Sequence, residues 1–167
     1  DLAICRMVLV PCASHVIYRH SGVPRRALAR VRRVGELAGL LRVFSGAGMG
    51  FRPFMENHVH LAMLDRFDEA GRRRCMELVA ALLRAWPDCR GLMGTSWYYD
   101  PAVAKVSPKL AYLHDDAAAG GACFIDMGPH PDAEAGALAR SATRRALRER
   151  GLYEPRNYLM IWSRKDI

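Results

Sequence analysis

The feature that most constrains the fold is an alternation of strand-like and helix-like segments, most of them closed by proline or glycine. Short apolar segments rich in β-branched or aromatic residues favour strands, and apolar residues spaced three and four apart favour helices between them. The expected strands are residues 4–10, 54–64, 90–99, 122–127 and 157–163. This order predicts a single α/β or α+β domain over 1–167, with a central mixed sheet of about five to six strands flanked by helices.

Helical periodicity is strongest in two segments. From Pro24 to about residue 44, one side of the expected helix is apolar and the other is basic, which predicts a basic amphipathic helix over 24–44. Its apolar residues are Val31, Val34, Leu37 and Leu41. A second helix is expected between Asp68, a capping residue, and Pro87. Its apolar residues are Cys75, Leu78, Val79, Leu82, Leu83 and Trp86.

Two further helical regions follow. Asp100-Pro101 and Ser107-Pro108 each combine a capping residue with a proline, so two short turns are expected over 101–113. A last helix is expected to open at Asp132 and to close with arginines before Gly151.

Positive charge is concentrated in the first half of the chain. The 167 residues include 25 Lys and Arg against 17 Asp and Glu, a net charge of +8. Seven arginines lie between Arg19 and Arg42, where Glu36 is the only acidic residue. This basic 19–42 face indicates an anionic partner: an anionic small molecule, an acyl carrier, an acidic protein or nucleic acid. An arginine-rich solvated surface without a specific ligand is an equally good interpretation.

The cysteines and the apolar segments suggest a compartment. The 5 Cys are scattered without a Cys-x-x-Cys pair, which favours reduced thiols and a cytoplasmic location. The first apolar run ends at Pro11 and is far shorter than the ~20 residues of a membrane span. No basic segment followed by a long apolar run marks a secretory signal. We therefore expect no membrane span.

Glu56, His58 and His60 form the best chemical candidate. On a strand their side chains would project from one face, because side chains alternate with period two. A carboxylate and two imidazoles on one surface suit general acid–base chemistry, with Glu56 or His58 as the base. The alternative is the polar face of an edge strand.

A metal site on His58 and His60 is a weaker interpretation of the same segment. Residues 56 and 60 are ~13 Å apart in an extended chain, so a further ligand from elsewhere would be needed. Two other local patterns carry less weight. The spacing of Cys5, Cys12, His15 and His20 lacks a zinc-finger pattern, and the glycines of 46–50 are better explained as a helix terminator than as a phosphate loop.

The segment Thr95–Pro101 is the second candidate. Two hydroxyl residues and three aromatic residues lead from a strand into a helix start, where ligands often bind in α/β sheets. We assign Ser96 a catalytic role and expect ligand binding from Thr95, Tyr98 and Asp100. The alternative is packing, with Trp97 and Tyr99 in the core, Tyr98 on the surface and Asp100 only a cap.

Several boxes in the second half resemble a set of uncharacterised bacterial proteins. They carry an S-W-[FY]-Y-D-P box, an S-P-x-L-A-Y-L box and a terminal Y-L-x-x-W-x-R strand. The matching segments here are Ser96–Pro101, Ser107–Leu113, Ser141–Leu147, Gly151–Pro155 and Tyr158–Arg164. The resemblance covers residues 90–164 and implies a bacterial domain, but it assigns no catalytic residue.

A looser likeness is to the acyl-CoA N-acyltransferase fold, which also alternates strands and helices in a mixed sheet. That family holds pyrophosphate at an R/Q-x-x-G-x-G/A turn, and this turn is absent. The nearest stretch, Arg90–Thr95, has its glycines in another register. The likeness therefore concerns architecture alone.

Together these features favour an acyl-group or small-molecule transferase that binds an anionic ligand, with acyl-CoA as a possible cosubstrate. One alternative is a non-catalytic partner subunit or nucleic-acid-binding module that uses the basic 19–42 face. Another is a metal-dependent enzyme that uses His58 and His60.

Overall fold

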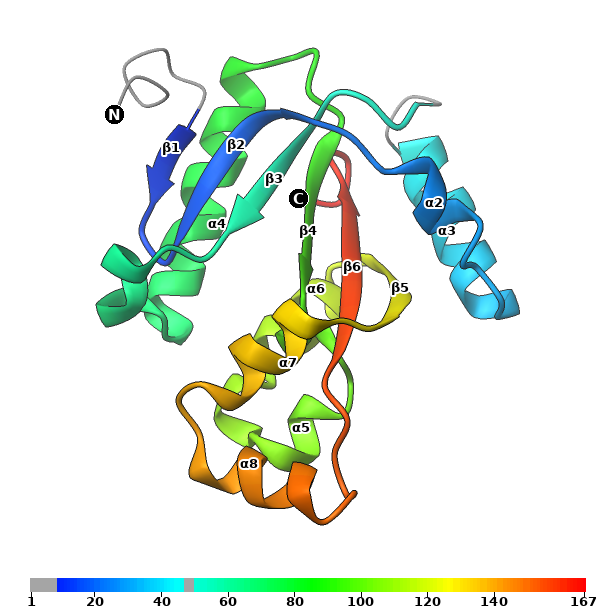
Figure 1. The fold of residues 1–167 in the computed structure, drawn as a ribbon. Coiled ribbons are helices and arrows are strands. Elements are labelled where there is room, and N and C mark those ends of the chain that lie inside the picture. The colour runs from blue at the N-terminus through cyan, green and yellow to red at the C-terminus, as the bar shows by residue number, and fades with distance from the viewer. Residues whose placement is uncertain (1–8, 47–49) are drawn as a thin grey trace.

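A six-stranded mixed sheet forms the centre of the protein (Figure 1). The structure is a computed structural model that describes residues 9–46 and 50–167. The strand order is β1-β2-β3-β4-β6-β5. Only β3 and β4 pair in parallel; all other neighbours are antiparallel. The strands are β1 (Leu9–Cys12), β2 (His15–Ser21), β3 (Phe54–His58), β4 (Gly91–Ser96), β5 (Cys123–Pro129) and β6 (Arg156–Ser163). This confirms the expected mixed sheet with flanking helices.

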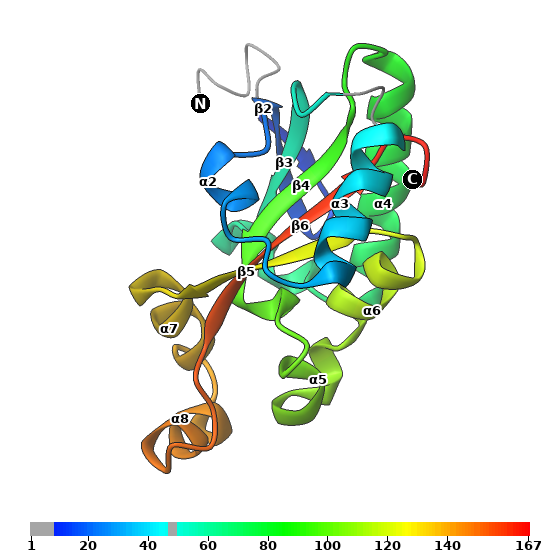
Figure 2. The same cartoon turned by 90° about the vertical axis from the view of Figure 1, so that its right-hand side faces the viewer.

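Helices cover both faces of this sheet. Figure 2 shows α2 and α7 on one side of the sheet and α4 and α6 on the other. The α-helices are α2 (Arg25–Leu28), α3 (Val34–Gly46), α4 (Glu69–Ala85), α5 (Val103–Val106), α6 (Tyr112–Ala119), α7 (Pro131–Leu138) and α8 (Ala142–Glu149). Short 3-10 turns are η1 (Leu61–Arg66), η2 (Trp97–Tyr99) and η3 (Pro108–Leu110). No helix within the described residues is long and apolar enough to cross a membrane.

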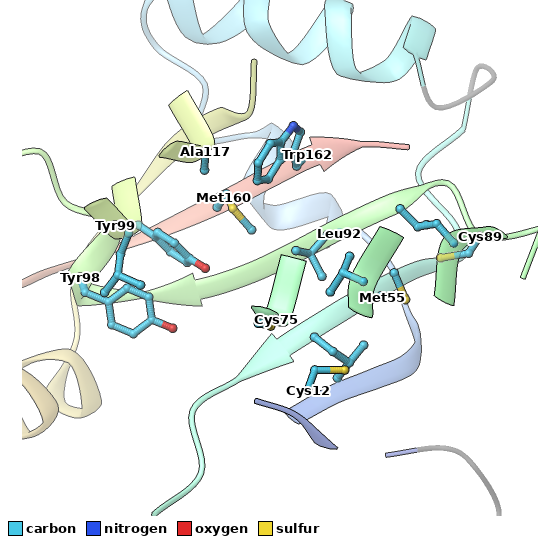
Figure 3. Close-up of a cluster of buried hydrophobic side chains, with 14 of the residues drawn as sticks. Cys12, Met55, Cys75, Cys89, Leu92, Tyr98, Tyr99, Ala117, Met160 and Trp162 are labelled. Atoms are coloured by element: carbon cyan, nitrogen blue, oxygen red, sulfur yellow. The ribbon is translucent and has the colours of Figure 1, made fainter. Parts of the chain in front are cut away.

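Two apolar clusters lie on opposite faces of the sheet, because successive side chains of a strand point to opposite sides. On β6, Met160 belongs to the cluster under α4, whereas Leu159 and Ile161 belong to the cluster under α2 and α3. Figure 3 shows Met55 and Leu92 of the paired strands gathered with the thiol-bearing residues of the first cluster. The sheet is therefore covered on both faces.

The predicted helix after Asp68 is confirmed. The Asp68 carboxylate accepts a hydrogen bond from the Gly71 N–H at 2.7 Å, and the helix runs from Glu69 to Ala85. Cys75, Val79 and Leu83 are buried as expected. Arg72, however, occupies the first position of the same buried stripe.

The predicted helix over 24–44 is wrong in two respects. The chain forms two helices, α2 and α3, separated by residues 29–33. The side of α3 that faces the core is also different: Leu40 and Val43 are buried, whereas Val34, Leu37 and Leu41 are 86%, 49% and 59% exposed. Periodicity located an apolar face, but tertiary packing uses the face beside it.

Other elements end earlier than expected. The 54–64 strand stops at His58 and the 90–99 strand stops at Ser96; a 3-10 turn follows each within a few residues. The last helix is two helices, because the Ser141 hydroxyl accepts a hydrogen bond from the Arg144 N–H at 3.2 Å and caps a new start. The prediction of one helix from Asp132 to the arginines before Gly151 is therefore wrong.

The first strands differ most from expectation. Most of the predicted strand 4–10 lies outside the described residues, and β1 begins at Leu9. The strand β2 was not predicted, and it forms a hairpin with β1 in which Cys12 pairs with His15. The four described cysteines, at 12, 75, 89 and 123, are free and buried. Burial raises the pKa of the Cys12 thiol to about 12, so this thiol stays protonated.

Candidate functional site

The parallel strands β3 and β4 separate toward their carboxyl ends (Figure 1). Their register contains two residue pairs, Met55 with Leu92 and Glu56 with Met93. Beyond them, β3 turns away into η1 and β4 continues beside β6. Side chains at the carboxyl ends of both strands therefore line a cleft instead of a continued ladder.

One part of this cleft, which we call the polar cleft, lies on the face covered by α2 and α7. It has a volume of about 500 Å³. Its wall combines cationic, acidic and hydroxyl side chains: Pro24, Arg26, Arg30, Glu56, His58, Thr95, Ser96, Trp97, Met127, His130, Asp132, Ala133 and Asn157. The predicted positions on β3, Glu56 and His58, meet the predicted positions on β4, Thr95 and Ser96, in this wall.

The second part, which we call the apolar cleft, opens between η1 and the α7–α8 region. Its volume is about 490 Å³, and it shares His58, Thr95, Ser96, Trp97 and Asp132 with the polar cleft. Its remaining wall is Asn57, Val59, Leu61, Leu64, Phe67, Tyr98, Leu110, Gly136, Ala139, Arg140 and Arg144. The shared residues make the two parts contiguous, so one elongated ligand can contact both.

Glu56 and His58 are adjacent in the polar cleft. The Ser21 hydroxyl of β2 donates a hydrogen bond to Glu56 Oε2 at 2.6 Å, and His58 Nε2 lies 3.7 Å from Glu56 Oε1. The Glu56 side chain is 23% exposed and the His58 side chain 54% exposed. A carboxylate held in place by a hydroxyl and open to solvent beside an imidazole can accept a proton from a bound ligand.

Ser96 and Tyr98 come from the end of β4 and the turn that follows. Thr95 is exposed and Ser96 half-buried. Tyr98 is buried, which corrects the alternative that placed it on the surface, yet it lines the apolar cleft. Burial raises the pKa of its hydroxyl well above the ordinary value, while a hydrogen bond with Ser96 acts in the opposite direction. Tyr98 therefore supplies a neutral hydroxyl.

Asp100 is separate from this group. It is buried and lines neither part of the cleft. Its Oδ1 accepts a hydrogen bond from the Ala102 N–H at 2.9 Å, as expected of a capping residue. Burial raises the pKa of its carboxyl group. Its geometry matches the packing interpretation of this residue.

His60 also departs from the pattern of the strand. It follows the end of β3, and its Nδ1 accepts a hydrogen bond from the Ala62 N–H at 3.2 Å, so it caps η1. The shared-face prediction holds for Glu56 and His58 and fails for His60. Among the residues that the structure describes, no cluster of three His, Cys, Asp or Glu side chains could hold a metal ion.

Several wall residues were not anticipated from the sequence. Arg30 comes from the segment after α2, and its Nη1 donates to the Met127 carbonyl at 2.6 Å. The Arg144 guanidinium stacks over the Trp97 ring at 4.6 Å, so this arginine does more than complement a helix dipole. Asn57 is buried and donates to the Tyr99 hydroxyl at 2.9 Å. The arginine-rich 19–42 segment was the only sequence signal for any of them.

No protein-family model, curated protein or solved structure matches this chain.

Proposed function

We propose that the chain is an acyl-group transferase whose anionic, acyl-carrying ligand occupies the cleft between β3 and β4. The observation that carries this proposal is the separation of the two strands after their second residue pair. A central sheet that opens at the carboxyl ends of parallel strands creates a binding crevice lined by both strands. Here that crevice joins a polar part to an apolar part.

The composition of the wall supports a ligand with an anionic end and an apolar chain. Arg26 and Arg30 line the polar part, and cationic side chains bind phosphate or carboxylate groups. Leu61, Leu64 and Phe67 line the apolar part, which suits an acyl chain. A coenzyme A thioester combines these properties, so we take it as the first ligand to test.

The chemistry would begin with proton removal from an acceptor amine or hydroxyl by Glu56 or His58. The acceptor then attacks the thioester carbonyl, and the electron pair of the C=O bond moves to oxygen. We expect the hydroxyl groups of Thr95 and Ser96, which line the polar cleft, to donate hydrogen bonds to that oxygen. When the carbonyl re-forms, the C–S bond breaks and the thiolate takes up a proton.

Ligand binding is tested by thermal unfolding with coenzyme A thioesters of increasing chain length. At about one hundred times the dissociation constant, binding adds ~2.7 kcal/mol to the free energy of unfolding. The Arg26→Gln variant should reduce this gain, whereas Arg25→Gln, an exposed neighbour outside the cleft, should retain it. If no thioester raises the melting temperature, or if both variants behave alike, the proposal is wrong.

Catalysis is tested with Glu56→Gln and His58→Ala. Loss of the base costs about 10²- to 10⁴-fold in rate, so one of the two variants should lose turnover while its melting temperature stays near that of the parent. Retention of activity by both would exclude this segment as the source of the base.

A second candidate function is that of a partner subunit docked through α3. The observation that favours it is the exposed apolar face formed by Val34, Leu37 and Leu41, beside Arg33 and Arg42. Apolar side chains bordered by arginines suit an acidic partner protein. Nucleic acid is distinguished by salt, because phosphate contacts weaken by orders of magnitude at moderate ionic strength. Binding of a partner protein through Leu37 would instead persist at moderate ionic strength.

A further inference from the structure

Arg72 is a buried cation that lacks a hydrogen-bond partner. It is 1% exposed, and its Nε, Nη1 and Nη2 atoms make no hydrogen bond with any residue of 9–46 or 50–167. A buried charge without compensation costs several kcal/mol. Arg73 and Arg74, its neighbours on α4, are exposed. A guanidinium at the head of an otherwise apolar stripe therefore points to an anionic ligand.

A second buried hydrogen-bond donor lies beside the same cavity as Arg72. It lines a cavity of about 590 Å³ between the start of α4 and residues 108–116. Tyr112 lines the same cavity, and its buried hydroxyl also lacks a partner among the described residues. Burial raises the pKa of Tyr112 to about 12, so its hydroxyl remains a donor at neutral pH. One carboxylate can accept hydrogen bonds from a guanidinium and a hydroxyl together.

The rim of this cavity has the opposite charge. Glu69, Asp115 and Asp116 line it, with Arg73 as the only cation besides Arg72. A multiply charged anion such as phosphate would be repelled by three carboxylates. A ligand that carries an ammonium group as well as a carboxylate would satisfy both the rim and Arg72.

We propose that this cavity binds a small amino acid, with its carboxylate on Arg72 and Tyr112 and its ammonium group toward the acidic rim. The site is distinct from the cleft between β3 and β4, and it does not depend on acyl transfer. The guanidinium and the Tyr112 hydroxyl have almost no solvent-accessible area, so the carboxylate reaches them only when side chains at the floor of the cavity move aside, and the contact is then made in a low-dielectric environment. A ligand of this cavity therefore needs a free carboxylate group.

The test compares each common amino acid with its C-terminal amide by thermal unfolding at matched ionic strength. At least one amino acid should raise the melting temperature of the full chain, and its amide should not. Arg72→Met should abolish the shift, whereas Arg74→Met, exposed on α4 and outside the cavity wall, should retain it. Equal shifts for acids and amides, or no shift with any amino acid, would overturn the proposal.

A milder variant keeps the test decisive if Arg72→Met folds poorly. Tyr112→Phe removes one hydroxyl donor from the cavity and should weaken the affinity about fivefold. An unchanged affinity in this variant would contradict the assigned pose. Without ligand, Arg72→Met should be at least as stable as the parent, because an uncompensated buried charge is removed. A large fall in its melting temperature would show that the guanidinium is already paired within the protein, which would also overturn the proposal.

Discussion

Burial at single positions changes the chemistry of several side chains, and His15 is the strongest example. It is fully buried at the start of β2, where the Ser14 hydroxyl lies 2.8 Å from its Nδ1. Burial is the main reason why its pKa falls from 6.5 to about 3, and the charges of Arg72 and His58 contribute further. The folded protein therefore holds this imidazole neutral, although the unfolded chain protonates it below its ordinary pKa.

This difference predicts acid sensitivity. The contribution of His15 to stability is complete above pH about 6.5 and is lost as the pH falls toward 3, because only the unfolded state binds the proton. Between pH about 6.5 and 5 the loss amounts to about 1.6 kcal/mol. Urea unfolding at both pH values measures it in the parent and in His15→Gln, which should lose most of this pH dependence. The exposed His130→Gln variant is the control, and a parent-like slope in His15→Gln would contradict the prediction.

At the scale of elements, α3 carries buried apolar residues on one side and exposed apolar residues on another. Leu40 packs against the sheet, whereas Leu37 and Leu41 face outward. We predict that Leu40→Ala costs about 2–4 kcal/mol of unfolding free energy, because it leaves a cavity. Leu37→Gln should cost less than about 1 kcal/mol, since little buried area is lost. Denaturant unfolding compares them, and similar losses at both positions would contradict the packing described.

The close approach of β3 and β4 at Gly94 leads to a second prediction at this scale, which concerns the effect of an added methyl group. A Cβ added at Gly94 would lie 1.9 Å from Asn57 Oδ1, where the strands begin to separate. Gly94→Ala should therefore destabilise the fold and alter the width of the cleft. Gly35, in α3, has no atom within 4 Å of its added Cβ, so Gly35→Ala should stabilise by about 0.5–1 kcal/mol. Melting temperatures that move in the same direction would refute this contrast.

The sequence predicted elements best where local chemistry was sufficient. The Asp68 cap and the spacing of Cys75 and Val79 are local signals, and both are present in α4 as predicted. The face of α3 depends on which side meets β5 and β6, so periodicity alone selected the wrong leucines. The same limit applies to the site: alternation on a strand placed Glu56 beside His58, but no pattern revealed that β3 ends before His60.

At the scale of the whole molecule, one sheet carries both apolar clusters on its two faces. No strand separates the clusters into independent units, because each central strand contributes side chains to both. For example, Leu92 and Met93 are successive residues of β4 that pack on opposite faces. Loss of either cluster therefore removes the support of the other.

This arrangement predicts a single cooperative unfolding transition. Far-ultraviolet circular dichroism and tryptophan fluorescence should give the same midpoint in denaturant, since the tryptophans report on tertiary packing while the dichroism reports on helices. Trp162 is a suitable reporter because its side chain is nearly buried and donates a hydrogen bond to the Gly120 carbonyl at 2.9 Å. Two separated midpoints would instead reveal two folding units.

The short parallel register between β3 and β4 is also the connection between two halves of the sheet. Two residue pairs join a three-stranded piece that ends in β3 to a three-stranded piece that begins with β4. Each piece keeps its own antiparallel ladder when the angle between them changes, so bending at this seam costs few hydrogen bonds. The two pieces are therefore joined by the shortest ladder of the sheet, next to the place where the polar and apolar parts of the cleft meet.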